Sequence, residues 1–327
     1  MIASVIARTW VAAERAAQLA SQFLGLAQDQ DGAWRDFHLM PGRAESWTTA
    51  YVADRVWQAQ RRWPDLLLDE CLRRAARFLS TSRRPGGWSY NQRCDPDADT
   101  TAQVILFLSR TGAEVTLNDY AALAKFQLVD GHFATYQICG SRCGWGRGHA
   151  EVTAVAMQAM SHVLHPQHVI LQRAENSLRE HIHGAHAADS YWWSSRNYLA
   201  RELLVLGRTY SGAPQLSVGC TDVVNDGSCF DRGLALEVEL LGGGETRKVE
   251  AAMAELLRLQ LADGSWPVEP ILRLTNPRAI DFDDPLFKAS TLFADDRRTF
   301  TTATILGAIS TQLQAHQGSG HGMKRSS

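Results

Sequence analysis

The sequence carries almost no net charge, with 33 lysine and arginine residues against 35 aspartate and glutamate residues. This balance gives no overall attraction to nucleic acids or to anionic membrane surfaces. The sequence also lacks an apolar run of the roughly 20 residues that a membrane-spanning helix needs. It contains no glycine-rich phosphate loop and no basic stripe interleaved with aromatic residues. We therefore expect a globular protein without a nucleic-acid partner.

Cysteine is scarce, with 6 residues that show no tight regular spacing. In a chain of 327 residues this favours reduced thiols over a disulfide framework. The start, MIASVIARTW, has a short apolar run broken by Arg8 and shows no clear secretory layout. These features predict a cytoplasmic location.

A short phrase that combines glycine with an aromatic residue recurs along the chain. It reads QDQDGAW at 28–34, RRPGGWSY at 83–90, FQLVDGHF at 126–133 and LQLADGSW at 259–266. Each phrase follows a helix-like run and precedes a run rich in small residues, such as SWTTAYVADRVW. Self-similarity at roughly fifty residues indicates stacked helical hairpins.

These hairpins predict an all-α protein, an α/α toroid of about six helix hairpins with Gly/Trp turns. We expect one domain over residues 1–315 and a disordered tail over 316–327. The turn aromatics Trp34, Trp88 and Trp266 are expected to pack between helices. An open α-solenoid is the alternative arrangement.

The stretch RCDPDADTTAQVILFL places Asp95, Asp97 and Asp99 directly before an apolar run that is typical of a buried helix. An aspartate at a helix N-terminus caps it and gains about 0.3–1 kcal/mol from the helix dipole. Capping explains one aspartate and leaves the others unexplained. A metal site is a second interpretation.

The repeated phrase resembles the repeats of squalene–hopene cyclases, oxidosqualene cyclases and protein prenyltransferase subunits, over residues 12–314. The string DADTTA at 97–102 resembles the Asp-x-Asp-Asp-Thr-Ala motif of class II terpene cyclases. Its variant Asp-x-Asp-Thr-Thr resembles the motif of drimane-type sesquiterpene cyclases. The resemblance implies that Asp99 donates a proton to an isoprene alkene, with Asp97 as its neighbour. Thr100 departs from the family, which usually has a third aspartate there.

A carboxylic acid with an ordinary pKa near 4 protonates an alkene poorly. A second carboxylate close by raises one pKa of the pair, so Asp97 is expected to keep a proton available on Asp99. Thr100 and His149 are candidates for a hydrogen bond that orients the acid. His149 has the alternative role of a polar residue at the cavity rim.

Aromatic faces stabilise carbocations without attacking them. Trp47, Tyr51, Trp145 and Trp192 lie near the expected starts of inner helices and are candidates to line the cavity. A prenyl diphosphate needs cationic donors, and Mg²⁺ commonly bridges its oxygens to carboxylates. The candidate cations are Arg147, Arg232, Lys288, Arg297 and Arg298. The weaker candidates for Mg²⁺ are Glu45, Asp283 and Asp284.

The resemblance thus implies a class II cyclase that converts farnesyl diphosphate to a bicyclic drimenyl-type diphosphate. The diphosphate is expected to be retained, because no Asp-Asp-x-x-Asp/Glu string precedes a helix. Cyclases of this class usually pair two toroids, so a homodimer or a partner protein is expected to seal the cavity here. Two alternatives stay open: a zinc prenyltransferase-like subunit using Cys220, Cys229 and Asp231, and a non-catalytic toroid that binds a lipid or a protein.

Overall fold

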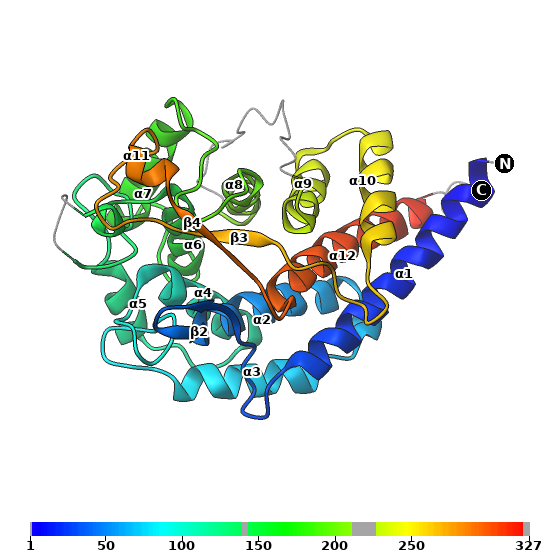
Figure 1. Ribbon diagram of the computed structural model, residues 1–327, viewed down its shortest axis with the longest axis horizontal. Coiled ribbons are helices and arrows are strands. Elements are labelled where there is room, and N and C mark those ends of the chain that lie inside the picture. Colours follow the sequence, from blue (N-terminus) through cyan, green and yellow to red (C-terminus); the bar gives the residue numbers. More distant parts are fainter. Residues whose placement is uncertain (1, 139–142, 211–226, 323–327) are drawn as a thin grey trace.

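Helices dominate the computed structural model, which describes residues 2–138, 143–210 and 227–322 (Figure 1). Its helices are α1 (Ile2–Ala27), α2 (Ser46–Arg62), α3 (Asp69–Thr81), α4 (Ala98–Thr111), α5 (Leu117–Ala124), α6 (Ala150–Met160), α7 (Val169–Ile182), α8 (Asn197–Thr209), α9 (Cys229–Gly242), α10 (Thr246–Leu259), α11 (Pro285–Lys288) and α12 (Thr299–Gly322). Its strands are β1 (Asp36–Leu39), β2 (Gly42–Ala44), β3 (Pro270–Leu274) and β4 (Thr291–Ala294). The mostly helical architecture confirms the predicted class, whereas the two β-hairpins were not predicted.

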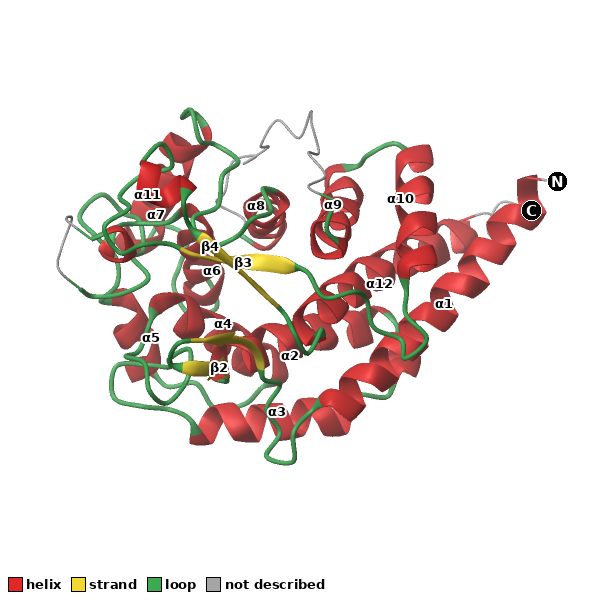
Figure 2. Cartoon of the chain, in the orientation of Figure 1, coloured by secondary structure: helices red, strands yellow, loops and turns green. Residues whose placement is uncertain are grey.

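Six helices pack side by side in the cyclic order α2, α4, α6, α8, α9 and α12, and α12 packs in turn against α2. Their residues are buried on almost every face, as all eleven residues of α6 show. Helices α1, α3, α5, α7 and α10 pack outside this inner set (Figure 2). The outer helices bury one stripe only, which is the pattern of an amphipathic helix facing water.

The repeated phrase folds into the turn that joins an outer helix to the next inner helix. Gln127 shows how the turn is held: its side-chain amide donates to the carbonyl of Gly131 at 3.0 Å and to that of Ile170 at 2.8 Å. Gly131 has φ +96°, a conformation that favours glycine. The same double contact is made by Gln28 to Gly32 and Cys71, and by Gln260 to Gly264 and Ala16. One glutamine in each of these three repeats therefore ties its turn to a neighbouring outer helix.

The turn aromatics occupy the gaps between helices, as predicted. The indole N–H of Trp88 donates to the carbonyl of Leu79 at 2.7 Å, and the Thr101 hydroxyl accepts the Trp88 backbone N–H at 3.0 Å. Trp34 and Trp266 donate in the same way to Leu24 and Leu256, both at 2.8 Å. Burial of each ring is thus combined with a partner for its only polar atom.

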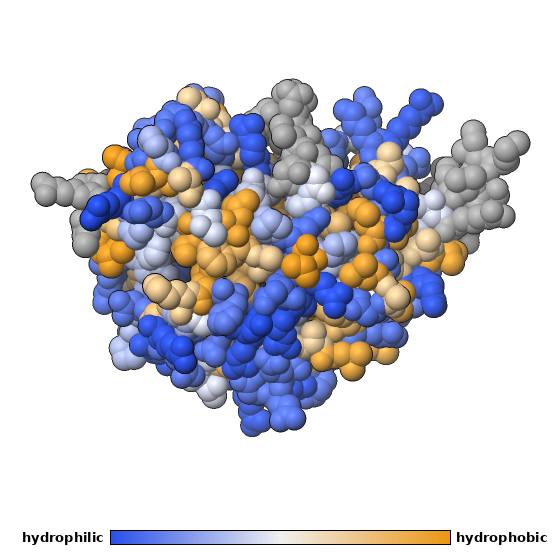
Figure 3. All heavy atoms as spheres, viewed as in Figure 1, coloured by the Kyte–Doolittle hydropathy of each residue, from blue (hydrophilic) through white to orange (hydrophobic). Residues whose placement is uncertain are grey.

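The two hairpins lie at one end of the inner helices. Strand β1 pairs with β2, β3 pairs with β4, and β1 contacts β4. The connection between β3 and β4 carries α11 and packs against the loop that follows α7, through Tyr191, Ala279 and Phe287. In the space-filling view, apolar residues gather around β3 near the centre of this face (Figure 3).

Among the described residues no helix combines the length and the apolar character that a membrane span requires. Helix α12 continues to Gly322, into the segment that we expected to be disordered from residue 316. Residues 323–327 of that segment lie outside the described residues.

Replacing Gly131 by alanine should destabilise the protein more than replacing Gly112. Both glycines have positive φ, which costs an alanine roughly 1–2 kcal/mol. A Cβ at Gly131 would also overlap the backbone carbonyl of Arg173, whereas nothing lies within 4 Å of a Cβ at Gly112. Chemical denaturation of Gly131→Ala and Gly112→Ala measures the difference, and equal losses would contradict this account of the turn.

Candidate active site

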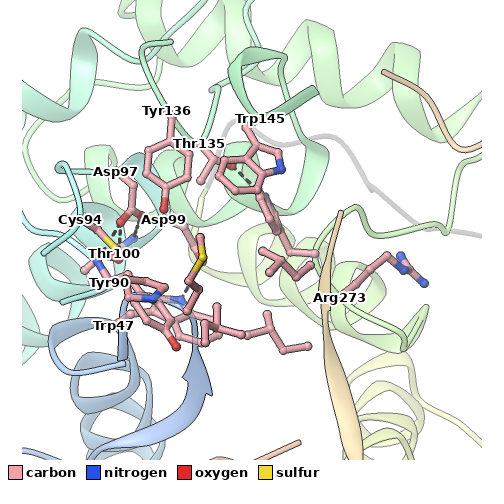
Figure 4. A pocket seen from close by; sticks show the side chains of 16 residues that line it. Trp47, Tyr90, Cys94, Asp97, Asp99, Thr100, Thr135, Tyr136, Trp145 and Arg273 are labelled. Atoms are coloured by element: carbon pink, nitrogen blue, oxygen red, sulfur yellow. Dashed lines mark hydrogen bonds between the residues drawn. The ribbon is translucent and has the colours of Figure 1, made fainter. Parts of the chain in front are cut away.

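A cavity opens between the two hairpins and the N-terminal ends of α2 and α4 (Figure 4). It is lined by Leu39, Met40, Pro41, Trp47, Tyr90, Cys94, Asp97, Asp99, Thr100, Thr135, Tyr136, Trp145, Trp192, Leu272, Arg273 and Leu274. Most of these side chains are apolar or aromatic. The carboxylates of Asp97 and Asp99 are the acidic groups of this lining.

Asp97 is the N-cap residue of α4 and is almost fully buried. Its carboxylate accepts hydrogen bonds from the backbone N–H of Thr100 at 2.7 Å, from the Thr100 hydroxyl at 2.8 Å and from the backbone N–H of Tyr90 at 3.1 Å. Burial raises the pKa of Asp97 to about 7, and these donors act in the opposite direction. Three donors to one carboxylate favour its ionised form.

Asp99 lies in the first turn of α4 and accepts one hydrogen bond, from the indole N–H of Trp47 at 2.8 Å. Burial and the neighbouring carboxylate of Asp97 raise the pKa of Asp99 to about 8. More distant carboxylates, Glu151 and Glu202, raise the pKa of Asp99 further. Asp99 is therefore protonated at neutral pH while it faces an apolar cavity.

The hydrogen bonds decide which aspartate of the pair holds the proton. Two carboxylates in contact with one low-dielectric region do not both ionise readily. Asp97 has three donors and Asp99 has one, so the negative charge resides on Asp97 and the proton on Asp99. We predicted that Thr100 or His149 hydrogen-bonds Asp99. Thr100 instead donates to Asp97, whose carboxylate raises the pKa of Asp99. Asp95 is exposed and takes no part.

The aromatic candidates divide into two groups. Trp47, Trp145 and Trp192 line the cavity, as predicted. Tyr51 does not: its ring stacks on Phe300 with centroids 3.8 Å apart, deeper in the barrel.

His149 caps α6 and lies outside the lining of the cavity. Its Nδ1 shares a hydrogen bond of 3.0 Å with the Thr135 hydroxyl, and its ring stacks on Tyr191. Burial lowers the pKa of His149 to about 3, so the ring is neutral. Since no hydrogen bond joins His149 to Asp99 among the described residues, His149 is not the group that orients the acid.

The predicted cations lie outside the lining and engage other partners. Arg147 donates to the carbonyl of Ile280, Arg232 pairs with Glu255, Lys288 with Asp283, Arg297 with Asp29, and Arg298 with Asp263. The structure does not bring them together. The lining contains one arginine, Arg273, whose side chain leaves β3 on the side opposite Asp97 and Asp99 (Figure 4). Its guanidinium donates to the carbonyl of Ser190 at 2.7 Å.

The three carboxylates proposed for Mg²⁺ do not fit a shared metal site. Glu45 pairs with Arg35 at 3.2 Å, Asp283 bonds His186 at 3.2 Å, and Asp284 caps α11. Across the described ranges, no group of three or more histidine, cysteine, aspartate or glutamate residues is placed to hold a metal ion. Of the zinc candidates, Cys220 lies outside the described residues, and Asp231 is buried against Ser195 and Asn197.

Sequence reasoning missed Tyr90, Thr135 and Tyr136. Tyr90 and Thr135 both stand two residues after the turn aromatic of their repeats, Trp88 and Phe133, and both line the cavity. Aligning the repeats on that aromatic would have found them. Figure 4 shows the Tyr136 hydroxyl directed toward the two aspartates.

Comparison with protein-family models and with curated proteins finds no match. Solved structures do match, and they show that the chain has the fold of the type II terpene cyclases. One is MstE from Scytonema without ligand, at a TM-score of 0.78 and 22% identity, covering 93% of this chain and 98% of that chain. A protein from Actinoplanes matches at 0.76 and 23%, with 93% and 99% covered.

The same scaffold also matches a possible member of the GH105 family from Klebsiella pneumoniae, at a TM-score of 0.56 and 11% identity, with 93% of each chain covered. A fold shared between such proteins does not define the reaction, so the function must be argued from the cavity.

Replacing Asp99 by asparagine should stabilise the protein at alkaline pH. Because folding raises the pKa of Asp99 from its ordinary value of 3.8 to about 8, the wild type loses stability as the pH rises between these values. Asparagine carries no charge, so the variant escapes this loss. We expect Asp99→Asn to gain at least about 1 kcal/mol over the wild type between pH 4.5 and pH 8.5.

Denaturation at the two pH values measures this gain. The exposed Asp95→Asn variant is the control for loss of a surface charge from the same loop. A stability difference between Asp99→Asn and the wild type that is the same at both pH values would show that Asp99 is ionised in the folded protein.

Proposed function

We propose that this protein is a class II terpene cyclase, built on a single α/α toroid, which starts cyclisation by protonating a prenyl alkene. The observation that carries the proposal is the carboxyl of Asp99 facing an apolar, aromatic cavity beside the carboxylate of Asp97, which raises the pKa of Asp99. The fold of the type II terpene cyclases and the DADTTA string support it.

In the first step the Asp99 O–H bond breaks and its proton forms a C–H bond with the terminal alkene carbon. The alkene π electrons supply that bond and leave a tertiary carbocation, while the O–H electron pair stays on Asp99 as a carboxylate. The indole N–H of Trp47 donates to the carboxyl group of Asp99, and this hydrogen bond strengthens as negative charge develops on Asp99. An interaction that is stronger in the transition state than before it lowers the barrier.

The cation then reacts with the next double bonds of the chain, each forming one C–C bond of a ring, until loss of a proton ends the reaction. The faces of Trp47, Trp145 and Trp192 and the ring of Tyr136 surround this space. Aromatic faces attract a cation by about 0.5–2 kcal/mol each without bonding to it. The apolar lining keeps out water that would quench the cation.

For the substrate we propose a farnesyl chain that becomes a bicyclic, drimenyl-type product, with farnesyl diphosphate as the first candidate. The Asp-x-Asp-Thr-Thr form of the motif supports this choice. Mg²⁺ is proposed as a companion of the diphosphate, since Mg²⁺ commonly keeps several waters and binds through substrate phosphates. Among the described residues we assign no carboxylate to the binding of Mg²⁺. A homodimer or a partner protein that seals the cavity stays a proposal.

A prenylated aromatic acid is the second candidate substrate. MstE has been solved with geranylgeranyl dihydroxybenzoate as substrate and with merosterolic acid A as product. Among the described residues the lining contains a single cationic side chain, Arg273, whose guanidinium donates to the carbonyl of Ser190. A benzoate head group needs fewer cations than a diphosphate.

The other two functions are less well supported. A zinc prenyltransferase site would need a cluster of metal ligands, and the described part of the chain contains none. A non-catalytic toroid would be favoured by Asp97 and Asp99 on the outside of the barrel, whereas both line the cavity.

Asp99→Asn should abolish cyclisation while the protein stays folded. Without the carboxylic proton, turnover is expected to fall by at least about 10³-fold, because general acid catalysis alone contributes about 10²–10⁴ and no other group of the lining replaces the acid. Incubation with farnesyl diphosphate and Mg²⁺, phosphatase treatment and mass spectrometry detect the bicyclic alcohol. Cyclisation by Asp99→Asn at the wild-type rate would assign the proton to another group.

The head group can be assigned by comparing farnesyl diphosphate with farnesyl dihydroxybenzoate, each with Mg²⁺ and with a chelator. We expect the diphosphate to be cyclised, and the chelator to lower its turnover by weakening diphosphate binding. Cyclisation of the aromatic acid alone, unchanged by the chelator, would reject the diphosphate and keep the protonation chemistry.

A further inference from the structure

The cavity reaches only part of the ring of inner helices. Its lining comes from the hairpins, from α2 and α4, and from the loops that precede α6 and α8. Helices α8, α9 and α12 contribute no lining side chain. Buried side chains therefore fill the space between the lining and these three helices.

The side chain of Trp193 lies directly behind this lining, against the ring of Trp47, and is not itself part of the lining. It is almost fully buried, and its ring lies against one aromatic ring from each surrounding helix. The ring centroids are 5.6 Å from Trp47 of α2, 4.5 Å from Tyr198 of α8, 5.2 Å from Phe230 of α9 and 5.0 Å from Phe300 of α12. Only Trp47 of these four lines the cavity.

Trp193 enters the barrel from a loop, unlike its four partners, which belong to helices. It pairs as an isolated bridge with Leu272 of β3, and Ser194 N–H donates to the carbonyl of Ile271 at 3.0 Å. Leu272 itself lines the cavity. Trp193 is thus attached to the strand that forms one wall of the site.

The packing of Trp193 differs from that of the turn tryptophans. Trp34, Trp88 and Trp266 each donate their indole N–H to a backbone carbonyl. No such hydrogen bond holds the Trp193 indole among the described residues, and ring contacts fix it instead. The space it occupies is bounded by aromatic rings, which is an environment suited to an isoprenoid chain.

We propose that Trp193 limits the length of the prenyl chain by filling the space behind the cavity wall, between Trp47 and the helices α8, α9 and α12. This inference rests on the proposed function and names a residue that sets its substrate class. A smaller side chain at position 193 opens a space of about one to two isoprene units, since a Trp ring is among the largest buried groups. The longer chain would extend along Tyr198, Phe230 and Phe300.

The test measures binding separately from turnover. Farnesol and geranylgeraniol, the fifteen- and twenty-carbon alcohols, are titrated by calorimetry into the wild type, Trp193→Ala and Trp193→Leu. We expect the wild type to prefer farnesol by at least tenfold in Kd, and Trp193→Ala to lose or reverse that preference. Trp193→Leu should shift the ratio of the two Kd values in the same direction by a smaller factor. This variant provides the test if Trp193→Ala does not fold.

Phe230→Ala is the matched control, because it removes a buried ring from behind Trp193 and leaves Trp193 between the cavity and the new space. It should keep the wild-type preference. An unchanged preference in both Trp193 variants, or the same shift in Phe230→Ala, overturns the inference. So does a wild type that binds both alcohols equally or binds neither.

Turnover separates this inference from the proposed function. A shift in binding preference without any cyclised product from prenyl substrates would keep the role of Trp193 and reject the cyclase. Cyclisation by the wild type, combined with no shift in the Trp193 variants, would keep the cyclase and reject Trp193 as the limit on chain length.

Discussion

The site depends on one arrangement: the buried carboxylate of Asp97 and the half-buried carboxyl of Asp99 lie close together and hold one proton between them, which resides on Asp99. Burial alone would raise both pKa values and leave the position of the proton undecided. The donors to Asp97 remove that ambiguity, because the cap geometry of α4 supplies the backbone N–H of Thr100 at 2.7 Å. A helix N-terminus favours negative charge, and its free backbone N–H donates to the cap residue Asp97 and not to Asp99, which lies two residues further along in the same first turn. The fold thus keeps Asp99 protonated because it stabilises the negative charge on Asp97.

Thr100 shows how a departure from a motif can preserve its chemistry. The cyclase motif that DADTTA resembles usually has a third aspartate at this position, which would add another charge or another proton. Threonine adds a neutral donor instead, and its hydroxyl bonds Asp97 at 2.8 Å. The pair therefore keeps a single proton and a single charge. Threonine in place of aspartate at position 100 therefore leaves fewer protonation states for the site and keeps the proton on Asp99.

The sequence was sufficient for the features that local rules govern. The glutamine, glycine and aromatic residue of each repeat act within one turn, so their spacing predicted helical hairpins and buried tryptophans. Asp99 was singled out because its motif is contiguous, and the structure places it in the lining of the cavity; its role as the acid stays a prediction. The cations were not placed, because their partners are chosen by the fold: Arg297 pairs with Asp29, 268 positions away. The position of Trp193 behind the lining was likewise not predicted, since a loop carries this residue between the inner helices.

Two buried ion pairs among the inner helices affect the charge state of Asp99. Beneath the aromatic rings, Arg55 bonds Glu237 at 2.6 Å, and Arg201 bonds Glu202 at 2.5 Å, all four nearly inaccessible to solvent. Their charges balance. An unpaired arginine in this low-dielectric interior would favour the anion of Asp99 and lower its pKa. With these arginines paired, the carboxylate of Asp97 is the charge that raises the pKa of Asp99 most, and the carboxylate of Glu202 acts in the same direction.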